Sequence, residues 1–146
     1  MGSIGKGDRM AYKFEQLEVW KLALDYIDLI YVVANQLPKP EEFNLKSQIT
    51  RAATSVSLNI AEGSTGLSDA EQTRFLSIAI RSLIETVACL HIIHRRGYLA
   101  DPEPLRAAYR ASERLFARLQ AFRKSLQSDT IRDESADYQI DTDIPF

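Results

Sequence analysis

Apolar residues recur every three or four positions along most of the chain, which is the spacing of one face of an α-helix. The pattern begins at Phe14 and continues to Leu37, after which Pro38 and Pro40 stop the helix from continuing. The residues at this spacing are Leu17, Trp20, Leu24, Ile27, Tyr31 and Ala34. The sequence therefore predicts a first long helix over residues 14–37, with these side chains on one face.

Three further helices are predicted, separated by short turn-forming stretches. One spans residues 41–62, with acidic residues in its first turn and Gly63 as a left-handed residue that ends it. The next begins near Ser68, where Ser-Asp-Ala-Glu matches a capping box, and ends at Gly97. The last starts after Pro102 and runs to about Ser128.

Strand signals are absent, because no period-two alternation is sustained and no Asn-Gly turn occurs. Four helices joined by short loops predict an all-α protein, an antiparallel up-down-up-down four-helix bundle over residues 13–128. Residues 1–12 are predicted to be a flexible leader, and residues 129–146 an acidic, loosely ordered tail.

The second predicted helix has a neutral surface that does not suit water. One of its faces is apolar and is assigned to the core: Leu45, Ile49, Ala52, Ala53, Val56 and Ile60. A second stripe is polar, at spacings of three and four: Gln48, Arg51, Ser55, Asn59 and Glu62. Between residues 47 and 61 only Arg51 is charged, whereas a solvated helix face usually carries Lys and Glu.

The third predicted helix is apolar nearly all round between Phe75 and Ile93, with Ile80, Ile84, Val87 and Ala88 outside its main apolar face. A helix of this kind is buried on more than one side, which four helices in one small subunit do not allow. We therefore predict a homo-oligomer, in which subunits pack through these two helices.

Three stretches resemble a known family. They are FEQLEVWKLAL (14–24), LKSQITRAATSVSLNIAEG (45–63) and RFLSIAIRSLIET (74–86), in register over residues 14–100. They resemble the four-helix-bundle proteins encoded in intervening sequences of bacterial large-subunit ribosomal RNA genes. One departure is Arg81, which stands where relatives usually have Gly and argues against close helix approach there.

That family is similar in turn to the accessory variability determinant of diversity-generating retroelements, a pentameric barrel that binds nucleic acid and the reverse transcriptase. The resemblance therefore implies a bundle that assembles into an oligomeric ring, with a pentamer favoured. It implies no catalytic residues, because none are established for the family.

The polar stripe is interpreted mainly as structural. In an antiparallel helix pair, Arg51 falls across from about residue 80, so an ion pair with Glu85 is expected between helices or subunits. We therefore group Glu85 with the five stripe residues as a structural or interface set. The alternative is a polar binding site.

Enzyme chemistry is not indicated. His91 and His94 lie three residues apart on the third helix, but no Glu-x-x-His motif and no further ligands at suitable spacing accompany them, so no metal is predicted. Cys89 lies in an apolar helix and is predicted to be a buried, inert thiol. Phosphate loops and nucleophile elbows are also absent, and we predict no catalytic residue and no cofactor.

The fourth predicted helix carries the strongest functional signal. Its arginines repeat every four residues, opposite an apolar face, and residues 105–124 carry about +5. The candidate nucleic-acid-binding residues are Arg106, Arg110, Arg114, Arg118, Arg123 and Lys124. The arginine side chain suits phosphate, so the helix predicts binding to the backbone of RNA or DNA without base specificity. The alternative is that this face is an ordinary solvated surface, and that the protein is a structural scaffold or a scaffold that binds a protein partner.

Charge is unevenly distributed along the chain. Residues 129–146 hold six acids and one base, about −5, whereas the rest of the chain carries about +3. We therefore hypothesise that the tail folds onto the arginines of the same or a neighbouring subunit and competes with nucleic acid. A single cysteine, no apolar run long enough for a membrane and no signal peptide predict a cytoplasmic protein that does not bind membranes.

Overall fold

The computed structural model describes residues 11–66, 68–127 and 143–146, and within these ranges the protein is all-helical, with four long helices and no strand. The helices are α1 (Glu18–Ala34), α2 (Leu45–Gly63), α3 (Asp69–Arg96) and α4 (Glu103–Leu126). Two short 3-10 helices, η2 (Lys13–Gln16) and η3 (Lys39–Glu41), precede α1 and α2. The predicted four-helix fold is confirmed, while most of the predicted leader and tail lies outside the described residues.

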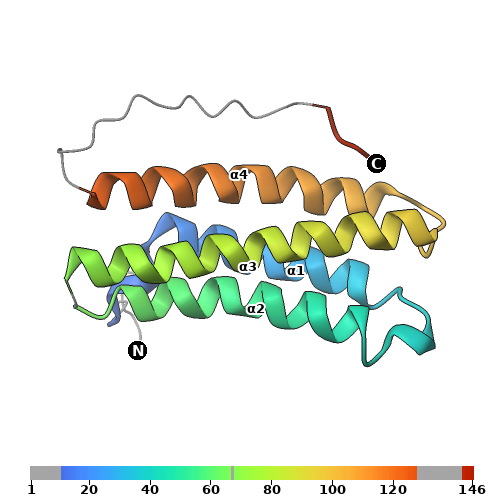
Figure 1. Ribbon diagram of the computed structural model, residues 1–146, viewed down its shortest axis with the longest axis horizontal. Coiled ribbons are helices and arrows are strands. Elements are labelled where there is room, and N and C mark those ends of the chain that lie inside the picture. Colours follow the sequence, from blue (N-terminus) through green and yellow to red (C-terminus); the bar gives the residue numbers. More distant parts are fainter. Residues whose placement is uncertain (1–10, 67, 128–142) are drawn as a thin grey trace, which may run out of the picture.

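The four helices run side by side with short connections (Figure 1). α1 packs against α2 and α4, and α3 packs against the same two helices. Within each diagonal pair, α1 with α3 and α2 with α4, the backbones do not approach closely. The diagonal arrangement matters for function, because α2 and α4 present their outer faces on opposite sides of the bundle.

The first two long helices, α1 and α2, begin later along the chain than the sequence predicted. The chain is extended at Leu17, so Phe14 belongs to η2 and α1 begins only at Glu18. Before α2, the proline-containing segment forms η3, so Glu41 belongs to η3 and not to α2. Its Oε1 accepts a hydrogen bond from the backbone amide of Leu45 at 3.3 Å, which gives one free amide of the first turn a partner.

The apolar stripe seen in the sequence is not the most buried face of α1. The buried residues are Val19, Ala23, Tyr26, Ile30, Val33 and Ala34. Of the stripe residues, Ala34 is buried, and Leu24 and Tyr31 are exposed. The other three are half-buried and pack against the core: Leu17, Trp20 and Ile27. Two apolar stripes with the same helical period lie about 100° apart on this helix, so the period alone could not select between them. α1 therefore keeps a second, partly exposed apolar face.

Gly63 ends α2, as predicted, but not in the left-handed conformation. Gly63 is the last residue of α2 and is buried, and its φ is not positive; Gly66 takes the left-handed conformation instead, with φ of 92°. A Cβ built at Gly63 would lie 2.9 Å from the Cβ of Phe75 on α3. Gly63 therefore allows α2 and α3 to approach closely at this turn.

The predicted ends of α3 are confirmed. The Ser68 hydroxyl accepts a hydrogen bond from the amide of Glu71 at 3.2 Å, and Gly97 ends the helix in the left-handed conformation with φ of 68°. Arg81 does not hold α2 and α3 apart, since it is exposed and the neighbouring Ser82 Oγ lies 2.9 Å from Ser55 Oγ.

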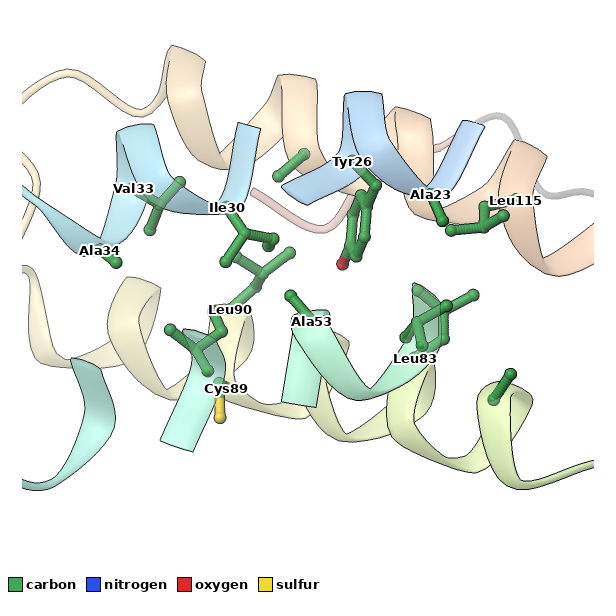
Figure 2. Close-up of a cluster of buried hydrophobic side chains, with 14 of the residues drawn as sticks. Ala23, Tyr26, Ile30, Val33, Ala34, Ala53, Leu83, Cys89, Leu90 and Leu115 are labelled. Atoms are coloured by element: carbon green, nitrogen blue, oxygen red, sulfur yellow. The ribbon is translucent and has the colours of Figure 1, made fainter. Parts of the chain in front are cut away.

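Apolar side chains from all four helices fill the core, and Tyr26 places its hydroxyl among them (Figure 2). The hydroxyl of Tyr26 on α1 lies 2.7 Å from Oγ1 of Thr86 on α3, and both residues are almost completely buried. Burial raises the pKa of Tyr26 above its ordinary range, so the hydroxyl stays protonated. This hydrogen bond links the diagonal helices through the centre of the bundle.

α3 is long and apolar enough to cross a membrane by length and composition alone, with mean hydropathy of 1.7 over an 18-residue window. In the structure 44% of that window is buried. The core helix of a bundle meets the same criterion, so this property is weak support for a membrane span. Nine residues of α3 are buried in the bundle.

Candidate nucleic-acid interface

All six basic residues proposed to bind nucleic acid lie on α4, as predicted, but their surroundings differ. The apolar face opposite them is at least partly buried throughout. Arg110, Arg114, Arg118 and Lys124 are exposed, whereas Arg106 and Arg123 are half-buried.

Three of the arginines have acidic partners. Glu103 accepts Arg110 at 2.8 Å and lies 3.7 Å from Arg106, and Glu18 on α1 accepts two hydrogen bonds from Arg118, at 2.7 and 3.1 Å. The side chains in these pairs are between 37% and 58% exposed, so water screens each pair and it contributes at most about 1 kcal/mol. A phosphate group could therefore compete for these arginines.

Arg123 has a structural position that its sequence spacing did not reveal. Its guanidinium donates to Ser77 Oγ on α3 at 3.0 Å and to Gln120 Oε1 at 2.6 Å. The side chain thus joins α4 to α3 rather than extending into solvent. By contrast, Arg114 and Lys124 are exposed and make no side-chain hydrogen bond or ion pair within the described part of the chain.

The polar stripe of α2 lies on another side of the bundle. Its five members, together with Glu85 from α3, all line one open hollow of about 850 Å³. Tyr31 of α1 and Leu58 of α2 contribute apolar surface to the same hollow. The six residues grouped from the sequence therefore share one hollow.

The expected ion pair between Arg51 and Glu85 is absent from the described ranges. Both side chains are exposed and line the hollow without an ion pair to any described residue. Ser55 carries the polar contact between helices instead: its hydroxyl meets that of Ser82, and it accepts hydrogen bonds from Asn59 Nδ2 at 2.8 Å through its carbonyl and at 3.1 Å through its hydroxyl.

The histidines of α3 have an aromatic neighbour that sequence reasoning missed. The ring of Phe146 lies 5.0 Å from the rings of both His91 and His94, measured between centroids. Arg106 donates a hydrogen bond to the main-chain oxygen of Phe146. The only signal in the sequence was the apolar Ile-Pro-Phe at the end of an otherwise polar segment.

Cys89 is buried, as predicted, and burial raises the pKa of its thiol, which disfavours the reactive thiolate. Among residues 11–66, 68–127 and 143–146, no group of three or more His, Cys, Asp or Glu side chains could hold a metal ion.

Comparisons with known proteins agree with the resemblance seen in the sequence. The family described as 23S rRNA-intervening sequence protein matches residues 15–121. No protein of curated function matches the chain. A solved structure of a protein of unknown function from the S23 ribosomal protein family of Bacteroides thetaiotaomicron VPI-5482 is 26% identical. The match covers 73% of this chain and 98% of that one, with a TM-score of 0.66.

Neither description assigns a catalytic activity, and the family is one of unknown function, not a known enzyme family. The match over residues 15–121 covers most of the helical bundle. The chain belongs to the 23S rRNA-intervening sequence protein family.

Proposed function

We propose that this protein is a non-enzymatic assembly protein, whose subunits associate through the α1–α2–α3 surface and bind nucleic-acid backbone through α4. One observation carries the proposal: the large hydrophobic residues exposed on the long helices lie away from α4, which carries a dense row of cations. The large hydrophobic residues exposed on the long helices are Leu24, Tyr31, Val32, Leu58, Ile84 and Ile92, all on α1, α2 or α3. Within its described residues, α4 exposes no large hydrophobic side chain and carries six cations.

Association through α2 would use a surface that suits a protein partner better than water. Leu58 and Tyr31 are about half exposed beside the polar stripe. Arg51 and Glu85 line the same hollow and could form ion pairs across an interface. We favour a second copy of the chain as the partner, and the family resemblance favours a closed pentameric ring.

Binding of nucleic acid would use the opposite side. Arg114 and Lys124 are exposed, and Arg110 and Arg118 can exchange screened carboxylate contacts for phosphate. Contacts of this kind position a protein on the phosphate backbone but do not read sequence. The proposal is therefore salt-dependent binding with little preference among sequences.

Assembly is tested by light scattering of the purified chain at tens of micromolar. A pentamer would have five times the 16.5 kDa mass of the subunit. We expect Leu58→Glu to yield monomers, because it places a charge at the centre of the interface. Phe43→Glu is the matched control, since Phe43 is 93% exposed in the connection before α2 and does not line the hollow. A monomeric wild type, or equal loss of mass in both variants, contradicts the proposal.

Nucleic-acid binding is tested by fluorescence anisotropy with a generic labelled duplex. The slope of log K against log salt is about −0.9 for each phosphate neutralised, so affinity should fall steeply between about 50 and 200 mM salt. Arg114→Glu with Lys124→Glu should weaken binding and flatten the slope by about two contacts.

The matched control is Lys13→Glu with Lys39→Glu, which makes the same change in net charge at exposed residues outside α4. If both pairs lose affinity equally, net charge rather than α4 governs binding. If the wild type does not bind at low salt, the chain is a structural or protein-partner scaffold. This second candidate function is favoured by the polar hollow and its apolar surroundings.

The acidic tail remains proposed as a competitor of nucleic acid. Residues 128–142 lie outside the described part of the chain, but the end of the tail does reach Arg106 through Phe146. Truncation after Ser128 should therefore raise affinity for RNA or DNA at low salt. Unchanged affinity at both low and high salt would contradict competition.

A further inference from the structure

The segment Asp143–Phe146 runs beside α4 (Figure 1). The ring of Phe146 meets three other rings, two from α3 and one from α4. Phe146 is 5.0 Å from His91 at an interplanar angle of 66°, and 5.5 Å from Tyr109 at 85°. It is also 5.0 Å from His94 at 46°. The edge-to-face geometry toward His91 and Tyr109 is the one that aromatic quadrupoles favour.

A fourth residue recognises the main chain of the segment. Arg106 donates through Nη1 to the main-chain oxygen of Phe146, and its Nε faces Glu103 at 3.7 Å. Glu103 can hold the guanidinium in position while one amine group remains directed at the segment. The four recognition residues thus come from two packed helices, two from α3 and two from α4.

We propose that His91, His94, Tyr109 and Arg106 form a peptide-recognition site for a phenylalanine residue, occupied here by Phe146 of the same chain as a displaceable ligand. The three rings surround the phenyl group, and the arginine binds the main-chain oxygen beside it. The partner class is a phenylalanine-bearing peptide. This inference does not depend on nucleic-acid binding or on assembly.

The burial of the segment argues for exchange rather than permanent packing. Phe146 and Ile144 are only half-buried, and Asp143 and Pro145 are exposed. Phe146 packs at the edge of the core cluster but is not one of its buried members. A tethered ligand has an effective concentration of about millimolar, so weak intrinsic affinity is enough to keep the site occupied until a competing peptide arrives.

The test uses NMR of the histidine ring C–H groups in the full chain. Phe146→Ala should shift the signals of His91 and His94, because a ring current 5.0 Å away is removed. Adding the free peptide Asp143–Phe146 to this variant should return both signals toward their wild-type positions. The wild type should need at least about tenfold more peptide, because its own segment competes.

Two controls separate recognition from general disturbance. Pro145→Ala changes an exposed residue of the same segment and should leave both histidine signals in place. A peptide with alanine in place of phenylalanine should not restore the signals of Phe146→Ala.

If Phe146→Ala does not fold, His91→Ala with His94→Ala tests the site from the other side, and should move the amide signals of Ile144 and Phe146. The proposal is overturned if Phe146→Ala leaves both histidine signals unchanged, since the site is then empty in solution. It is equally overturned if about 10 mM peptide fails to bind the open site, a limit set by the millimolar effective concentration of a tether.

Discussion

The hydrogen bond between Tyr26 and Thr86 has a direction that the structure assigns. Thr86 donates its single hydroxyl proton to the carbonyl of Leu83 at 2.6 Å, so the Tyr26 hydroxyl must be the donor in the 2.7 Å contact between them. The two partners are therefore not equivalent. Removing the Tyr26 hydroxyl leaves Thr86 with a partner for its proton, whereas removing the Thr86 hydroxyl leaves a buried donor with none.

This asymmetry predicts unequal costs for two conservative substitutions. Tyr26→Phe should reduce the free energy of unfolding by about 1 kcal/mol, the net value of one hydrogen bond. Thr86→Val should cost about 2 to 3 kcal/mol, because it leaves the Tyr26 hydroxyl unpaired where the residue is only 1% exposed. The double variant replaces both polar groups by apolar groups of similar shape, so it should be more stable than Thr86→Val alone.

Urea denaturation followed by far-ultraviolet circular dichroism measures these differences by linear extrapolation. All four proteins must be compared at one subunit concentration, because association makes apparent stability depend on concentration. The reasoning is refuted if Tyr26→Phe costs as much as Thr86→Val, or if the two effects simply add in the double variant. Either result would mean that the polar pair is hydrated in solution or that its donor is assigned wrongly.

Three further predictions concern single sites outside this pair. Gly63→Ala should destabilise the bundle by about 1 to 3 kcal/mol, because the new Cβ would lie 2.9 Å from the Cβ of Phe75. The same substitution at an open helical position would instead stabilise the fold by about 1 kcal/mol. A rise in the urea midpoint would therefore contradict the close contact. The Tyr98 hydroxyl, 2.7 Å from Glu41, lowers the pKa of that carboxyl. The contact therefore stabilises the fold at pH above the ordinary carboxyl pKa, and this stabilisation is lost as pH falls through the lowered pKa of Glu41. Tyr98→Phe should raise the pKa of Glu41 in a carbon-13 NMR titration, and an unchanged pKa would exclude the contact. Cys89 should react with a disulfide reagent far more slowly in the native protein than in urea, and equal rates would contradict its burial.

The spacing of apolar residues identified the buried face of a helix that has one apolar stripe, but not of a helix that has two. All six core residues predicted for α2 are buried, from Leu45 to Ile60, because the other sides of that helix are small or polar except at Leu58. On α1 the stripe with Leu24 and Tyr31 is only partly buried, since Tyr26 and Ile30 belong to an equally regular stripe that faces the core. Only the position of α2 and α4 decides which stripe is buried.

Long-range contacts explain the remaining errors. Whether a glycine provides a left-handed turn or space for a neighbour depends on what lies beside it, and Phe75 is twelve residues from Gly63 along the chain. Arg123 shares the charge of its neighbours on α4, but its half-buried position depends on Ser77 of α3. Phe146 lies in a segment without helical period, so nothing local linked it to Arg106, forty residues earlier.

The diagonal arrangement connects the two parts of the proposed function. α2 and α4 do not contact each other closely, so burial of the α2 hollow between subunits would leave α4 accessible on every subunit. In a closed ring the arginine rows would then repeat at fixed spacing, and linked sites bind a long backbone more tightly than one site does without any new contact. Affinity should then depend on assembly: Leu58→Glu should weaken binding to a long duplex far more than binding to one short enough for a single subunit. Equal weakening on both lengths would show that the ring adds nothing to binding.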